Sequence, residues 1–192
     1  MNFRFALRAS VPSSVRSGAV VSLALCAAVA LTACGSMGSS RPGAVANLVP
    51  TAAVTPNPTM GTVVFSALDH GVRIKGEVRG LAPGSEHGFH IHEKGDCANN
   101  GDASGGHFNP TGLTHGKFGA PGSHAGELPS LVADAAGVAR FSVDDHSLSM
   151  TEGADNNVVG RALIVHRDRD DFTTQPSGNS GPRIACAIVT RS

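Results

Sequence analysis

The most regular feature of this chain is a series of short, mainly apolar runs separated by turn-forming residues. Over residues 72–78 apolar and charged positions alternate, which is typical of a β-strand with one buried face. A second apolar run covers 62–68, and Asp69-His70-Gly71 between them tolerates the backbone angles of a tight turn. The two runs therefore predict a β-hairpin. Further strands are predicted at 87–92, 131–132, 138–143, 162–166 and 185–190.

The pattern contains no convincing long amphipathic helix. Many short strands with turn signals between them indicate an all-β fold, either an antiparallel sandwich or a barrel. Residues 60–192 have the length of one domain with its own core, and the sequence shows no internal repeat or second domain.

The first 33 residues have the composition of a secretory signal peptide. Arg4, Arg8 and Arg16 form a basic region without acids, and residues 18–33 are almost wholly apolar but too short to span a bilayer comfortably. The sequence Leu31-Thr32-Ala33-Cys34-Gly35 resembles the lipobox of bacterial lipoproteins, in which the cysteine is acylated. Lipid on Cys34 is therefore expected to hold the mature protein at a membrane. The alternative is ordinary cleavage that gives a soluble product.

Residues 34–59 show no sustained periodicity and are interrupted by glycine, serine and proline, so they are predicted to form a flexible tether. Beyond Ala33 the chain carries 12 Lys and Arg against 15 Asp and Glu, a formal charge of −3 with histidine neutral. No basic run suggests nucleic acid as a partner. Because the overall sign would repel an anion, any attraction of an anion must be local, and Arg183 is the candidate for it.

Six histidines stand in a segment of short strands and glycine-rich loops. Neutral imidazole is the commonest metal ligand in proteins, and six imidazole rings are more than one metal ion can bind. In His90-Ile91-His92 the alternation of a strand sends both rings to the same face. The other four are His107, His115, His124 and His166. A single histidine is more often hydrogen-bonded than metal-bound, but this constellation predicts a site for two metals.

Several motifs resemble the copper-zinc superoxide dismutases, particularly their bacterial secreted branch, from about Gly61 to the C-terminus. They occur in the order and with the spacing of that family. The motifs are His87-Gly88-Phe89-His90-Ile91-His92-Glu93, Gly95-Asp96-Cys97, Gly105-Gly106-His107-Phe108-Asn109-Pro110, Gly160-Arg161-Ala162 with Val165-His166, and Gly181-Pro182-Arg183-Ile184-Ala185-Cys186. The resemblance implies an antiparallel Greek-key β-sandwich or flattened barrel with long metal-binding loops, and this family is itself a recognised example of the sandwich architecture.

The resemblance also implies a role for each candidate ligand. The implied copper ligands are His90, His92, His107 and His166, and the implied zinc ligands are His107, His115, His124 and Glu127. Glu127 stands where the family usually has aspartate. The extra methylene moves the carboxylate in a site whose ligand distances vary by only about 0.2 Å, so the loop must adjust.

Outside the ligands, the resemblance makes Asp170 a residue that hydrogen-bonds ligands of both metals, and His87 a structural histidine. It implies a disulfide between Cys97 and Cys186, which requires an oxidising compartment such as the periplasm or cell envelope. Two free thiols or a cysteine ligand are the alternatives. Arg183 matches the arginine that guides and holds superoxide beside copper, although its residue type alone also allows a surface or disulfide-packing role.

The implied function is the disproportionation of superoxide to dioxygen and hydrogen peroxide outside the cytoplasm. One rival is an extracytoplasmic copper-binding or buffering protein, which needs neither an anion-guiding arginine nor a bridging ligand. The other is a zinc hydrolase that activates water, but nothing in the sequence resembles its general base. The bacterial branch includes homodimers and monomers, and the sequence does not decide between them.

Overall fold

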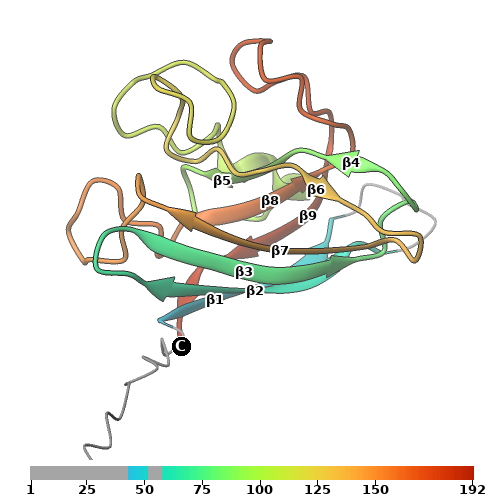
Figure 1. Ribbon diagram of the computed structural model, residues 1–192, viewed down its shortest axis with the longest axis horizontal. Coiled ribbons are helices and arrows are strands. Elements are labelled where there is room, and N and C mark those ends of the chain that lie inside the picture. The colour runs from blue at the N-terminus through green and yellow to red at the C-terminus, as the bar shows by residue number, and fades with distance from the viewer. Residues whose placement is uncertain (1–42, 52–57) are drawn as a thin grey trace, which may run out of the picture. The chain divides into compact units, whose positions relative to one another are not determined.

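The computed structural model describes residues 43–51 and 58–192. Within these residues the fold contains ten strands and one short 3-10 helix. Figure 1 shows how they are arranged. They are β1 (Ala44–Pro50), β2 (Met60–Ala67), β3 (Val72–Arg79), β4 (Glu86–His87), β5 (Phe89–His92), η1 (Asn99–Ser104), β6 (Leu131–Val132), β7 (Val138–Asp145), β8 (Ala162–His166), β9 (Arg183–Ile188) and β10 (Thr190–Arg191). Within the described residues no helix is long and apolar enough to cross a membrane.

The main sheet has the strand order β5-β8-β9-β1-β2-β3-β7, with β10 also paired to β1. All of its pairings are antiparallel. β1 joins two parts of the sheet, because Ala44–Leu48 pair with β2 whereas Val49 and Pro50 pair with β9. The sheet is curled: Phe89 of β5 and Phe141 of β7, on strands at opposite ends of the order, have ring centroids 5.1 Å apart. The predicted antiparallel sandwich or flattened barrel is confirmed.

The core lies between the curled faces and is made by alternate residues of the strands. Phe65, Ile74, Phe89, Ile91 and Leu163 are each almost fully buried. Burying one such side chain contributes roughly 1.5–3 kcal/mol. Because β5 and β8 belong to this core, the backbone of the histidines that they carry is held rigidly.

The predicted tether over 34–59 is wrong for residues 44–50, which form β1. Ala44, Ala46 and Leu48 are buried at alternate positions, so this strand contributes to the core. Two of those three side chains are only methyl groups, and glycine and proline flank the run, which explains why the alternation was too weak to predict a strand. Residues 34–42 and 52–57 of the tether prediction, and the predicted signal peptide with Cys34, lie outside the described residues.

The predicted strand 87–92 is divided in two at Gly88. His87 belongs to β4, which pairs with β6, whereas β5 pairs with β8. A Cβ atom at Gly88 would lie 2.6 Å from Oγ of Ser180, so a glycine is needed where the chain passes from one strand to the next. The hairpin around Gly71 is confirmed by the β2–β3 pairing and by the hydrogen bond from Leu68 N to Gly71 O.

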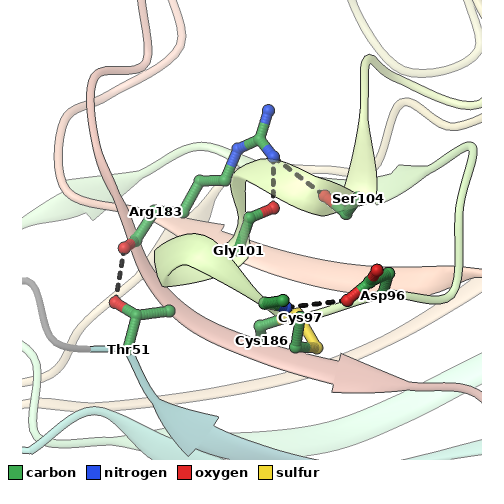
Figure 2. Close-up of a disulfide and its surroundings, with 8 residues drawn as sticks. Thr51, Asp96, Cys97, Gly101, Ser104, Arg183 and Cys186 are labelled. Carbon is green, nitrogen blue, oxygen red and sulfur yellow. Dashed lines mark hydrogen bonds between the residues drawn. A yellow bond between two sulfur atoms is a disulfide. The ribbon is translucent and has the colours of Figure 1, made fainter.

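A disulfide joins Cys97, in the loop before η1, to Cys186 of β9 (Figure 2). The two cysteines are 89 residues apart in the chain. In the loop-entropy model, closing a loop of this length restricts the unfolded chain by about 4–5 kcal/mol. The bond confirms the predicted pairing and fixes the loop that leads to His107 against the sheet.

Candidate metal centre

β5 and β8 place three histidines beside one another. His90 and His92 lie on one face of β5, while Ile91 between them enters the apolar core. His166 ends β8, where the register with β9 shifts between Val165 and His166. Such an irregularity redirects a side chain, and Nε2 of His166 lies 3.4 Å from Nε2 of His92.

His107 reaches the same place from the loop after η1. Its backbone forms an isolated bridge with His92, and its ring stacks on that of His90 with centroids 3.9 Å apart. His115 and His124 follow in a long loop that returns to the sheet, where Glu127 forms a bridge with His90. The histidines of the strands and those of the loop therefore lie at the same place in the fold.

The seven predicted ligands form two clusters that share His107. In each cluster, one ligand atom from every residue lies within 4.8 Å of the others. The first contains His90, His92, His107 and His166, and the second contains His107, His115, His124 and Glu127.

Hydrogen bonds to the outer side of the first cluster decide which nitrogens face inward. Nδ1 of His92 donates to the carbonyl of Gly105 and Nδ1 of His166 donates to that of Gly181, both at 2.9 Å. Since a carbonyl only accepts, both rings carry their proton on Nδ1 and leave the lone pair of Nε2 free. These two nitrogens point at the centre of the cluster.

Two further buried nitrogens of this cluster lack partners in the part of the chain that the structure describes. They are Nδ1 of His90 and Nε2 of His107. A buried polar atom left unpaired costs about 1–3 kcal/mol. Four inward nitrogens without a proton donor match the donor set of a borderline metal ion such as copper.

Glu127 lies at the centre of the second cluster. Its Oε1 is 3.1 Å from Nδ1 of His107, 2.9 Å from Nδ1 of His115 and 2.7 Å from Nδ1 of His124. The contact with His124 lacks hydrogen-bond geometry, since Nδ1 of His124 has no hydrogen-bond partner. Glu127 is only 2% exposed. Three nitrogens and one oxygen at these positions fit the ligand types of a tetrahedral zinc site.

Asp170 connects the two clusters by way of their outer nitrogens. Its Oδ2 accepts a hydrogen bond from Nε2 of His90 at 2.7 Å, and its Oδ1 accepts one from Nε2 of His115 at 2.9 Å. Such partners fix the orientation of a ligating ring. Gly178 packs against this pair so closely that a Cβ atom there would lie 1.8 Å from Oδ1 of Asp170.

Burial keeps three histidines of the first cluster neutral, namely His90, His92 and His166. Desolvation lowers the pKa of His90 and of His92 well below 6.5, and neighbouring histidines lower both further. Desolvation also lowers the pKa of His166, to about 4. At neutral pH these rings therefore keep the lone pairs that a metal needs.

The first cluster opens into a cleft of about 660 Å³ that Arg183 also lines. The guanidinium donates to the carbonyl of Gly101 and to Oγ of Ser104 at 3.0 Å (Figure 2). It also donates to the carbonyl of Gly105 at 2.7 Å. Burial lowers the pKa of Arg183, and this effect outweighs the opposite effect of the Asp102 carboxylate. Arg183 thus lines the cleft and also packs against the loop held by the disulfide.

The remaining histidines lie away from both clusters. Nδ1 of His87 is 2.9 Å from the carbonyl of His166, which supports its structural interpretation. His70 and His146 are exposed. Sequence reasoning missed the carbonyls of Gly105 and Gly181 as ring partners, because any residue type supplies a carbonyl.

Comparison with known proteins identifies the family. The family model of copper/zinc superoxide dismutase matches residues 59–189. The chain belongs to the copper/zinc superoxide dismutase family. A superoxide dismutase [Cu-Zn] of Paramecium bursaria Chlorella virus 1 is 36% identical over 147 residues, which cover 73% of this chain and 78% of that protein. Superoxide dismutase [Cu-Zn] 2 of Aquifex aeolicus (strain VF5) is 37% identical over 139 residues, covering 70% and 81%.

Two solved structures share the fold. A SOD-like protein from Bacillus subtilis superposes with a TM-score of 0.67 at 35% identity, covering 77% of this chain and 99% of that one. The clock protein EA4 gives the same TM-score at 30% identity, covering 78% and 94%. Family membership and the two histidine clusters together show that this chain is an enzyme that uses copper and zinc.

Proposed function

We propose that this superoxide dismutase works at a copper ion that the first cluster would hold, beside a zinc ion that the second cluster would hold, with His107 offering one ring nitrogen to each cluster. The reaction converts two superoxide anions and two protons into dioxygen and hydrogen peroxide. The observation that carries the assignment is the set of buried, unpartnered nitrogens at the centre of the first cluster. An apolar or hydrogen-bonded core would not leave these atoms unpaired.

When bound, copper would supply one-electron redox chemistry, whereas zinc would not change oxidation state. The chain supplies the rest. Nε2 of His107 faces the copper cluster and Nδ1 faces the zinc cluster, so this ring can hold a proton on Nε2 and pass it to the reduced oxygen species. Asp170 keeps His90 and His115 in orientation during the cycle.

Arg183 is proposed to attract and hold the anion in the cleft. The net charge beyond residue 33 is −3, so the protein as a whole repels superoxide. The cleft that His92, His107 and His166 line also holds the guanidinium of Arg183, which attracts an anion locally, and two carboxylates that oppose this attraction, those of Glu93 and Asp102. The hydrogen bonds to the loop carbonyls fix its position without neutralising its charge.

Metal content and superoxide turnover measured together test this proposal. We expect one copper and one zinc per chain, activity that disappears when copper is chelated, and recovery on adding copper back. A blue-green protein with full copper content that does not inhibit superoxide-driven dye reduction would instead favour the copper-buffering alternative.

Glu127 is expected to be needed for zinc more than for copper. Glu127→Ala removes the oxygen of the second cluster and should lower zinc retention by at least about ten-fold, because loss of a mere hydrogen-bond partner of a ligand already costs about ten- to a hundred-fold. The four copper histidines should still retain copper. Glu127→Asp should have a mild effect if the loop can bring the shorter carboxylate forward. Metal analysis after dialysis against a weak chelator measures both. Zinc content equal to wild type in Glu127→Ala would exclude Glu127 as an important ligand.

We further propose that the enzyme is attached to a membrane through lipid on Cys34 and protects the cell envelope from external superoxide. The basic and apolar segment before Cys34 supports this location, as does the disulfide, which needs an oxidising compartment. Cys34→Ser is expected to move the protein from the membrane fraction to the soluble fraction without changing turnover. An unchanged distribution would contradict the anchor.

A further inference from the structure

The side chain of Gln175 holds the backbone of His115. Oε1 of Gln175 accepts a hydrogen bond from the His115 N–H at 2.9 Å, and Nε2 of Gln175 donates to the His115 carbonyl at 2.9 Å. Within residues 43–51 and 58–192, both hydrogen bonds of the His115 backbone come from this one amide. The side-chain amide of Gln175 therefore pairs with the His115 backbone in the way that a neighbouring strand would.

This contact matters because His115 is buried but lies in a long loop. The residue is 4% exposed, so its backbone N–H and carbonyl would lose their partners and gain little water if the amide were removed. The ring of His115 is held separately by Asp170, five residues before Gln175. One short segment thus fixes both the ring and the backbone of the same residue.

The same segment forms part of the wall of the copper-side cleft. Pro176 and Ser177, which follow Gln175 directly, line that cleft together with His166 and Arg183. Nζ of Lys117, two residues after His115, also lies 6.0 Å from the ring centroid of Phe172. The loop that carries His115 and the segment over 170–177 are therefore joined at several points.

We propose that Gln175 is a positioning residue for the zinc site, which acts by fixing the backbone of His115 so that Nδ1 stays directed at Glu127. Nδ1 of His115 lies 2.9 Å from Oε1 of Glu127. A ring pivots about its own backbone, so freeing the N–H and carbonyl displaces the nitrogen even though Asp170 still holds Nε2. This inference rests on the proposed zinc assignment of His115.

The test measures zinc release from the copper- and zinc-loaded enzyme into a chromogenic chelator. Gln175→Ala is expected to release zinc about ten-fold faster, the scale usual for partners of metal ligands. Gln175→Asn keeps the amide but is one methylene too short to reach both backbone groups, so it should also accelerate release. Cobalt placed in the zinc site should show a changed visible spectrum in both variants, which reports ligand geometry independently of turnover.

Thr174→Ala is the matched control. Thr174 donates from Oγ1 to Asp171 within the same segment and does not contact His115 through its side chain. Its zinc release is expected to stay within about two-fold of wild type. Wild-type release in both Gln175 variants, or equal acceleration in Thr174→Ala, would overturn the proposal.

His115→Ala separates this inference from the assignment beneath it. If His115 is a zinc ligand, that variant loses zinc, and a negative result with Gln175 then bears on Gln175 alone. If His115→Ala keeps its zinc at the wild-type level, the zinc assignment itself is wrong.

Discussion

His107→Ala is expected to cause the largest loss of activity of any single histidine replacement, about a hundred-fold or more per bound copper. Among the described residues His107 alone belongs to both clusters, so its removal takes a candidate ligand from each of them. It also removes Nε2, the group proposed to hold the transferred proton, and positioned proton transfer typically contributes 10²–10⁴-fold. Superoxide turnover of purified protein, normalised to measured copper, gives the comparison.

His115→Ala is the natural control for this variant. His115 belongs to the second cluster alone, and its side chain is also a buried imidazole hydrogen-bonded to a carboxylate. Its replacement should weaken zinc binding but leave the four nitrogens of the copper cluster in place, so activity per copper should fall much less. Comparable losses in the two copper-loaded variants would count against a bridging role for His107.

The part of the site that could be predicted from local sequence is the part carried by strands. Alternation along His90-Ile91-His92 placed two rings on one face, and the structure puts Ile91 in the core between them. The apolar run before His166 likewise predicted a buried strand, and β8 is fully buried. These predictions succeed because a strand has a fixed period, which converts spacing directly into direction.

The loop ligands could not be placed by periodicity. His107, His115 and His124 converge on Glu127 because a bridge, a disulfide and several glycine turns bring the loop back to β5, and none of these is visible as a repeat. Family resemblance supplied those residues instead. The choice of nitrogen on each ring also required the structure, since it depends on which carbonyl lies behind the ring.

The strand β1 shows a different limit. Its buried positions are Ala44, Ala46 and Leu48, which are so small on average that the local pattern resembled a linker. The strand exists because β2, β9 and β10 each offer it hydrogen bonds, so its stability comes from partners distant in sequence. The same reasoning explains why Gln175 was not anticipated: its role is defined only by a residue 60 positions away.

Arg183 is expected to control how fast superoxide reaches the copper-side cleft. Arg183→Glu reverses the charge that opposes the net −3 of the chain beyond residue 33, and should lower kcat/KM by about one to two orders of magnitude. Because charges at a cleft mouth are screened by salt, the penalty should shrink as ionic strength rises from about 0.01 M to 0.15 M. Stopped-flow decay of superoxide at several salt concentrations measures both effects.

Two further variants separate steering from structure, which is necessary because the guanidinium also holds the loop through Gly101, Ser104 and Gly105. Arg183→Lys keeps the charge but cannot form the three-point contact, so a steering role predicts that most of the activity survives.

Arg167→Glu makes the same charge reversal on an exposed side chain that does not line the cleft, and should change kcat/KM little. Copper content should remain nearly constant in all three variants. If Arg183→Lys loses copper and activity as severely as Arg183→Glu, the side chain serves to hold the loop, because only the hydrogen-bonding fork, and not the charge, differs between lysine and wild type.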